Sequence, residues 1–176
     1  MKSVTSWLER KLFLKVSATK TKVVRPYDSN FLGFTYIRMK GKWECKPTDK
    51  SKMSLYDKCR KVLIRKKCIA HTNTVTFTRI NQIVRGWINY YRIGKMKTFM
   101  FEFGQWLRHK IRVIILKQWK KPLCIQRNLE HLNKYLKRKF SFEEIFKVAN
   151  SRLGWYRRSY GKVVNFLLNA NILAIR

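Results

Sequence analysis

Acidic residues are scarce in this chain of 176 residues. Nine Asp and Glu stand against 41 Lys and Arg, so the formal net charge is +32 at pH 7. The nine acids are dispersed, whereas two-metal phosphoryl transfer needs clustered carboxylates to hold its ions. The sequence also lacks a glycine-rich loop that could bind phosphates and a recognisable context for a serine or cysteine nucleophile. We therefore predict that the isolated chain is not an enzyme and that it holds no metal or other cofactor.

Motifs for zinc binding, secretion and membrane insertion are missing as well. The four cysteines form no Cys-x-x-Cys pair and the three histidines are scattered, which argues against a zinc finger or ribbon. Reduced thiols fit a reducing compartment. The longest uninterrupted aliphatic run, Val113 to Leu116, is far too short to cross a bilayer, and no signal-peptide core follows Met1. These absences predict an intracellular protein without a membrane partner.

The excess of positive charge indicates a polyanionic partner. A compact chain with this charge repels itself unless a polyanion neutralises it, and each phosphate contact of a nucleic acid releases condensed counterions. An anionic membrane surface and a solvated basic face without any partner are the competing interpretations. Hydrophobic residues make up 45% of the chain and aromatic residues 14%, which is enough for a buried core and excludes a disordered basic tail.

Strand signals are confined to the first 47 residues. Residues 3–13 have the pattern of a short helix with Trp7 and Leu8 directed towards a core, and residues 12–16 alternate as a strand does. Two apolar runs, 31–37 and 43–45, flank the connection Lys40-Gly41-Lys42. This arrangement is typical of a β-hairpin.

From residue 48 onwards the pattern is helical, so the predicted fold class is mainly α. Pro122 ends the third helix, and Ser141 with Glu144 has the spacing of a capping box at the start of another. We predict three domains over residues 1–47, 48–122 and 123–176. The helices are expected at about 48–68, 78–93, 97–119 and 128–139, then from 141, with a final short helix from 163.

The helix expected at 78–93 carries the strongest binding signal. Its apolar residues follow helical spacing on one side, while Gln82, Arg85, Asn89 and Arg92 follow spacings of three, four and three on the other. This polar face has two guanidinium groups, two amides and no acid, although ordinary solvated faces mix charges of both signs. Such a face suits phosphate oxygens, sugar hydroxyls and base edges. A merely solvated face is the alternative.

Further basic residues share helix faces or lie beside aromatic rings, which can stack on bases. They are the remaining candidate RNA contacts of the helical region: Lys58, Lys61, Arg65, Arg108, Arg112, Lys117, Lys120, Lys121, Arg157 and Arg158.

Four segments resemble bacterial group II intron reverse transcriptases, also called maturases. Phe31-Leu32-Gly33-Phe34 resembles the last palm block of that family, and the segment from Arg85 to Tyr91 (RGWINYY) resembles the centre of its maturase-specific X, or thumb, domain. The segment 117–122 (KQWKKP) is similar to the basic end of that domain, and 149–155 to the C-terminal region. The resemblance implies a helical thumb/X bundle with a small palm remnant that holds the hairpin.

The resemblance also implies contacts and partners. It places Arg85, Asn89 and Arg92, together with the nearby Lys95 and Lys97, at structured RNA, namely the group II intron RNA, in the cytoplasm of a bacterium. An RNA–DNA primer–template is a further partner, and so is a separate fingers/palm polypeptide. The fingers, most of the palm with its Tyr-Ala-Asp-Asp motif, and the paired-cysteine endonuclease domain have no counterpart here. Magnesium would therefore belong to that missing palm or to the RNA.

Three hypotheses remain open from the sequence. In the first, the chain is an RNA-binding maturase fragment that assists intron folding and splicing. In the second, it is the C-terminal piece of a split RNA-directed DNA polymerase whose fingers and palm are supplied in trans. In the third, it is a relic that binds nucleic acid without specificity.

Overall fold

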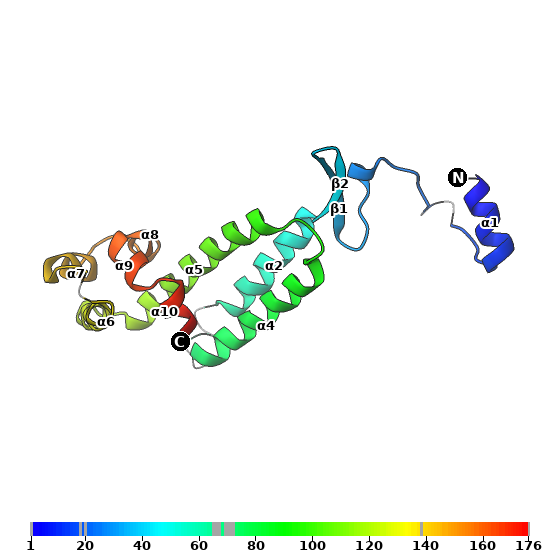
Figure 1. Ribbon diagram of the computed structural model, residues 1–176. Helices are drawn as coiled ribbons and strands as arrows, with labels where there is room; N and C mark the ends of the chain where they lie inside the picture. The colour runs from blue at the N-terminus through cyan, green and yellow to red at the C-terminus, as the bar shows by residue number, and fades with distance from the viewer. Residues whose placement is uncertain are drawn as a thin grey trace. The chain divides into compact units, whose positions relative to one another are not determined.

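The computed structural model describes residues 2–17, 19, 21–64, 68, 73–137 and 139–175. It confirms a mainly α-helical fold with a β-hairpin towards the N-terminus (Figure 1). The chain divides into two compact units. Unit 1 consists of Met1–Ser51 with Ile93–Lys95, and unit 2 consists of Lys52–Arg92 with Met96–Arg176.

Unit 1 contains helix α1 (Lys2–Leu12), a 3₁₀ turn (Pro26–Asp28) and the antiparallel strands β1 (Phe34–Met39) and β2 (Lys42–Pro47). The strands pair from Phe34 with Pro47 to Met39 with Lys42, so only two residues connect them. Both of these, Lys40 and Gly41, have positive φ angles of 47° and 78°. This is the type I′ geometry that matches the twist of a hairpin, and it confirms the hairpin predicted around this glycine.

A second tight turn leads into β1 and is hydrogen-bonded to the start of the first long helix. Leu32 and Gly33 have φ angles of 50° and 78°, and the backbones of Phe31 and Phe34 exchange two hydrogen bonds across them. The carbonyl oxygen of Gly33 accepts hydrogen bonds from the backbone N–H of Thr48 (2.9 Å) and from the hydroxyl of Ser51 (3.2 Å). The chain therefore turns from strand to helix at a fixed point.

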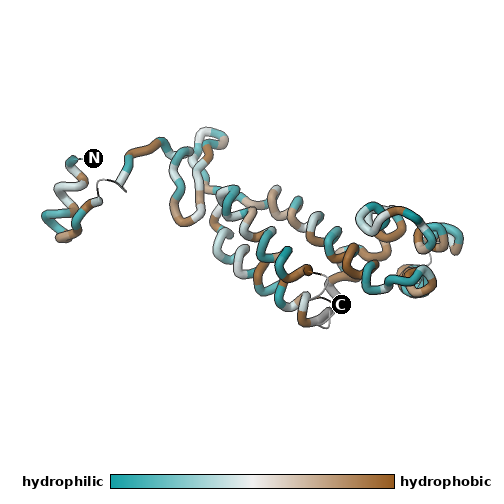
Figure 2. Tube along the Cα trace, turned by 180° about the vertical axis from the view of Figure 1, so that it is seen from behind, coloured by the Kyte–Doolittle hydropathy of each residue, from teal (hydrophilic) through white to brown (hydrophobic). Residues whose placement is uncertain are grey.

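Two expectations for the N-terminal residues are wrong. Residues 13–17 form no strand although they alternate in polarity. Helix α1 is present, but it buries none of its residues, and Trp7 is 55% exposed. The extended run between α1 and the hairpin also carries exposed hydrophobic residues, visible as brown stretches in Figure 2.

In unit 2, three long helices pack through aromatic rings. They are α2 (Asp49–Val62, from Lys52 onwards), α4 (Asn73–Tyr91) and α5 (Lys97–Trp119). Tyr56 of α2 contacts Phe103 and Trp106 of α5, with ring centroids 5.2 and 4.7 Å apart. Trp87 of α4 contacts Phe99 of α5 at 5.2 Å. Aromatic pairs of this kind add to the burial of the rings themselves, so α5 is the central helix to which α2 and α4 are fixed.

The second half of α5 belongs to an aliphatic core. It packs with α6 (Pro122–Tyr135), α7 (Phe142–Ala149), α9 (Lys162–Leu167) and α10 (Ala170–Ile175), while α8 (Trp155–Tyr160) lies along α5. The fully buried members of this core are Leu116, Ile125, Leu129, Ala149, Val164, Leu167 and Leu168.

Helix boundaries agree with expectation where a capping signal is present. The helix predicted at 97–119 is α5, and the capping box of Ser141 and Glu144 is confirmed at the start of α7. Three predictions need correction. Helix α4 begins at Asn73 rather than near residue 78. Helix α2 ends at Val62 rather than near residue 68, and α6 begins at Pro122 rather than near residue 128. Proline suits the first turn of a helix because its missing N–H would have no partner there.

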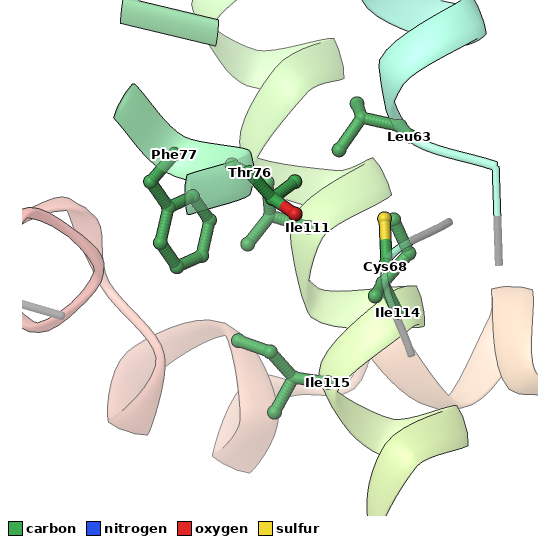
Figure 3. Close-up of a pocket in the computed structure, with 7 residues that line it drawn as sticks. All are labelled: Leu63, Cys68, Thr76, Phe77, Ile111, Ile114 and Ile115. Atoms are coloured by element: carbon green, nitrogen blue, oxygen red, sulfur yellow. The ribbon is translucent and has the colours of Figure 1, made fainter. Parts of the chain in front are cut away.

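A small cavity lies between the ends of α2, α4 and α5 (Figure 3). Leu63, Thr76, Phe77 and three isoleucines of α5 line it together with Cys68. Its volume of about 10 Å³ is the space of a single water molecule. This cavity is too small for an organic ligand. In the described part of the chain, no helix combines the length and the apolar character that crossing a bilayer requires.

Candidate nucleic-acid interface

The outward face of α4 consists of polar and basic side chains. Gln82, Arg85, Asn89 and Arg92, the residue after the helix, are all exposed. On the opposite side Ile80 is buried, as are Trp87 and Tyr91. The helical period therefore separates the two sets as the sequence predicts. We call the four residues Gln82, Arg85, Asn89 and Arg92 the α4 face.

Aromatic packing holds the α4 face in place from behind. The ring of Trp87 lies 4.5 Å from that of Tyr91 and 5.2 Å from that of Phe99 on α5, measured between centroids. Both α4 rings are only 9% exposed. Because these large side chains are packed on one side, the opposite side of the helix is presented to solvent in a fixed orientation.

Sequence reasoning missed two members of this surface. Arg79 is exposed on α4, three residues before Gln82, and the spacing could have revealed it. Gly86 is exposed too, next to Arg85, and a Cβ atom added to it would meet no atom within 4 Å. The packing of α4 therefore does not require a glycine at this position. The missing side chain leaves free space in the middle of the basic surface.

Basic residues of α2 are exposed as well. Lys58 and Lys61 are exposed, whereas Arg65 lies outside the described residues. The exposed Arg60 between them forms an ion pair with Asp57 (2.9 Å) and lies over the rings of Tyr56 and Trp106. Its stacking on these rings shields part of the aromatic core, so Arg60 serves packing as well as charge.

The two lysines after α4 belong to different units. Lys95, in unit 1, forms an ion pair with Glu44, and its backbone N–H donates to the carbonyl oxygen of Cys45 (2.8 Å). Lys97, in unit 2, is exposed in the first turn of α5. Part of the positive charge of Lys95 is therefore balanced within its own unit, while Lys97 presents its charge to solvent.

Arg112 is a correction to the predicted interface. Its side chain is only 7% exposed, and its guanidinium group donates to the carbonyl oxygens of Leu168 (2.8 Å) and Asn165 (3.3 Å) near the end of α9. Burial and the nearby Arg108 lower its pKa, although an arginine remains charged. Arg112 thus satisfies carbonyl groups at a helix terminus. Arg108, one turn earlier on α5, is half-buried.

The basic residues at the end of α5 differ in exposure. Lys117 is half-buried in the last turn, whereas Lys120 and Lys121 are exposed in the link to α6. Lys120 has a positive φ angle of 52°, and its N–H donates to the carbonyl oxygen of Leu116 (3.2 Å). The link is therefore a compact turn that holds two exposed lysines at the end of the central helix.

The arginines of α8 have different roles. Arg157 is exposed, but Arg158 is half-buried. The guanidinium group of Arg158 lies 4.9 Å from the ring centroid of Trp155 and donates to the carbonyl oxygen of Ser151. Arg158 therefore fixes the start of α8, and Arg157 is the residue of this pair that can reach a ligand.

Comparison with known protein families finds a match in the first part of the helical region. Residues 52–136 match the family described as the group II intron, maturase-specific domain. This region is similar to a maturase-specific domain. No curated protein matches the chain. The matched residues run from α2 to the end of α6, so the matched region includes the α4 face and the basic residues of α2 and α5.

The charges of the matched region favour an anionic ligand. No Asp or Glu occurs from residue 58 to residue 101, or from residue 103 to residue 129. Within these limits, Glu102 alone interrupts the positive charge. Long-range attraction of a polyanion is the expected effect of such a surface.

The described residues include no group of three or more His, Cys, Asp or Glu side chains placed to hold a metal ion. The four cysteines are free, and burial raises the pKa of Cys59 to about 11. This thiol therefore stays protonated near neutral pH and is a poor nucleophile.

Proposed function

We propose that the chain binds group II intron RNA through the α4 face and its basic surroundings, and that it thereby assists folding and splicing of the intron. The observation that carries the proposal is the α4 face itself. It presents two guanidinium groups and two amides on a helix whose opposite side is fixed by Trp87 and Tyr91, and it lies within the matched maturase-specific domain. Guanidinium groups and amides suit the phosphates, sugar hydroxyls and base edges of structured RNA.

Charge removal on the α4 face provides the first test. Arg85→Ala and Arg92→Ala are each expected to weaken RNA binding by about 1 kcal/mol or more, the scale of a charge-assisted hydrogen bond. The logarithm of the dissociation constant should also depend less steeply on the logarithm of the salt concentration, because fewer phosphates are neutralised. Fluorescence anisotropy with labelled intron RNA at several salt concentrations measures both effects.

The matched control is Arg127→Ala. Arg127 is exposed on α6 and lies outside the proposed contacts, so its removal lowers the net charge by the same amount as Arg85→Ala. If the three variants lose affinity equally, the binding depends on total charge and not on the α4 face. Splicing of the intron RNA at low magnesium concentration, with and without the protein, then tests whether binding assists folding.

A second function is favoured by a separate observation. Unit 1 exposes large apolar side chains, among them Phe13 at 90%, Val23 at 77% and Phe31 at 63%. Such residues suit an interface with another polypeptide. The chain would then be the C-terminal piece of a split RNA-directed DNA polymerase that grips an RNA–DNA primer–template. A neighbouring open reading frame that encodes the catalytic carboxylates would support this function, and co-purification of the two polypeptides tests it.

The affinity for different nucleic acids distinguishes a maturase from a relic that binds any nucleic acid. The maturase proposal predicts tighter binding to the intron RNA than to transfer RNA or duplex DNA at the same salt concentration. Equal affinity for the three ligands would favour the relic.

A further inference from the structure

Helix α8 presents two tyrosine rings that the core does not enclose. Tyr156 is 53% exposed and Tyr160 is 60% exposed, although both belong to a helix that packs along α5. The third aromatic residue of this helix, Trp155, is half-buried and covered by Arg158. Both tyrosines therefore present more than half of their surface to solvent, although they belong to a packed helix.

The two tyrosine rings are nevertheless held in place. Both contact the imidazole of His109 on α5, which is only 2% exposed. The centroid of Tyr160 lies 4.0 Å from that of His109 at an angle of 31° between the planes, and the centroid of Tyr156 lies 4.2 Å away at 81°. The buried ring thus lies against Tyr160, and this tyrosine still exposes 60% of its surface.

Hydrogen bonds fix the buried histidine under the tyrosines. The hydroxyl of Ser159 donates to the carbonyl oxygen of Tyr156 (2.7 Å), so its oxygen accepts from Nδ1–H of His109 (3.1 Å). Burial, Lys110 and Arg112 lower the pKa of His109, so the ring is neutral near pH 7. The arrangement of His109, Tyr156 and Tyr160 is therefore preorganised, which reduces the entropy lost on binding a ligand.

The surroundings of the exposed rings are positively charged. The ammonium group of Lys110 lies 5.7 Å from the ring centroid of Tyr156, and Arg157 is exposed beside it on α8. No Asp or Glu occurs from residue 103 to 129 or from residue 145 to 176. A neutral apolar partner would leave these cations without compensation, whereas a chain of phosphates matches them. Aromatic faces among cations are the combination that binds single-stranded nucleic acid.

We propose that Tyr156 and Tyr160 form a stacking platform for an unpaired nucleobase of single-stranded RNA, with Lys110 and Arg157 at the flanking phosphates. A base on the outer face of Tyr160 would continue the stack that begins at His109. Tyr156, Tyr160 and Arg157 lie beyond residues 52–136 and Lys110 lies on α5, so the platform is a site additional to the α4 face. The inference rests on the proposed RNA binding and extends it from paired and structured RNA to an unpaired loop or end.

The test uses the full chain and two labelled RNAs with the same number of phosphates, a hairpin with an unpaired loop and a blunt duplex. The double variant Tyr156→Leu/Tyr160→Leu is expected to bind the hairpin about 5- to 150-fold more weakly, the range for loss of one stacked base. Its affinity for the duplex and the slope of its salt dependence should equal those of the wild type, because no charge changes. The pair Tyr156→Phe/Tyr160→Phe keeps the rings and is expected to retain hairpin binding.

The matched control is Tyr135→Leu, because Tyr135 is a similarly exposed tyrosine on α6. Thermal unfolding of each variant confirms that the fold is kept. The stacking platform is refuted if the double leucine variant binds the hairpin as the wild type does, or if it loses affinity for hairpin and duplex alike. If the wild type itself shows no salt-dependent affinity for either RNA, the proposed RNA binding is what fails.

Discussion

Replacing Gly86 by alanine is expected to change stability and RNA binding in opposite directions. Gly86 lies in the interior of α4, exposed beside Arg85, and an added Cβ would meet nothing within 4 Å. In an exposed helix interior, glycine is less favourable than alanine by about 0.8–1.0 kcal/mol. Because the structure offers no clash to offset this gain, Gly86→Ala should raise the free energy of unfolding by about that amount, or the melting temperature by about 2–4 °C.

The expected effect on RNA has the opposite sign. A glycine on a binding surface allows a ligand backbone to approach the helix closely, and a methyl group at that point holds it away. Displacement of a phosphate from Arg85 or Asn89 weakens at least one charge-assisted hydrogen bond. The affinity for intron RNA should therefore fall about fivefold or more, which corresponds to about 1 kcal/mol.

Two measurements on the same protein samples decide this prediction. Thermal or urea unfolding gives the stability, and fluorescence anisotropy with labelled intron RNA gives the affinity. Gly104→Ala is the control for the stability measurement alone, because it also replaces a helical glycine but lies on α5, where the new Cβ would be 3.2 Å from Nη1 of Arg108 and no comparable gain is expected. A Gly86→Ala protein that is more stable and binds RNA like the wild type would refute close approach at this point. A less stable one would refute the outward placement of residue 86.

Two further predictions concern the buried polar groups of α5. Burial lowers the pKa of His109 below its ordinary value of 6.5. The unfolded chain therefore binds a proton at this histidine at a higher pH than the folded chain does. His109 thus lowers the free energy of unfolding as the pH drops below about 6.5. Urea unfolding at pH 7.5 and 5.5 should show a smaller pH dependence for His109→Phe than for the wild type, and equal dependence would contradict the assignment. Arg112→Met should lower the free energy of unfolding by about 2–4 kcal/mol because two carbonyl groups near the end of α9 lose their donor, one of them wholly buried. If chemical denaturation shows a change below about 1 kcal/mol, the structural role of Arg112 is wrong.

The sequence was sufficient to predict elements that depend on local signals. The helix at Lys97–Trp119 ends before a proline, the hairpin turns at Lys40 and Gly41, and α7 begins with a capping box. Each of these depends on residues within one or two turns of each other. The α4 face was predictable for a related reason, since apolar and polar residues alternate with the helical period and the apolar side is strong enough to identify the core.

Other features depend on residues that are distant in the sequence. Arg112 has the same helical spacing from Arg108 that an exposed basic pair would have. In the structure the end of α9 packs over Arg112. No residue near position 112 indicates this contact, because its partners lie more than 50 residues later in the sequence. The spacing that is reliable for α4 fails for α5 because a central helix has neighbours on several sides. Pro122 was ambiguous for a simpler reason, because proline both ends one helix and begins the next.

The runs without acidic residues have a consequence for the amount of folded protein in a cell. A chain with mutual repulsion across 41 basic residues is least stable when no polyanion is bound. A ligand that binds only the folded state adds about 2.7 kcal/mol of stability when its free concentration is 100 times the dissociation constant. Under the proposed function, transcription of the intron would protect the protein from proteolysis, and copies made in excess of the RNA would be degraded first. The abundance of the protein would then follow the abundance of its RNA without any dedicated regulator.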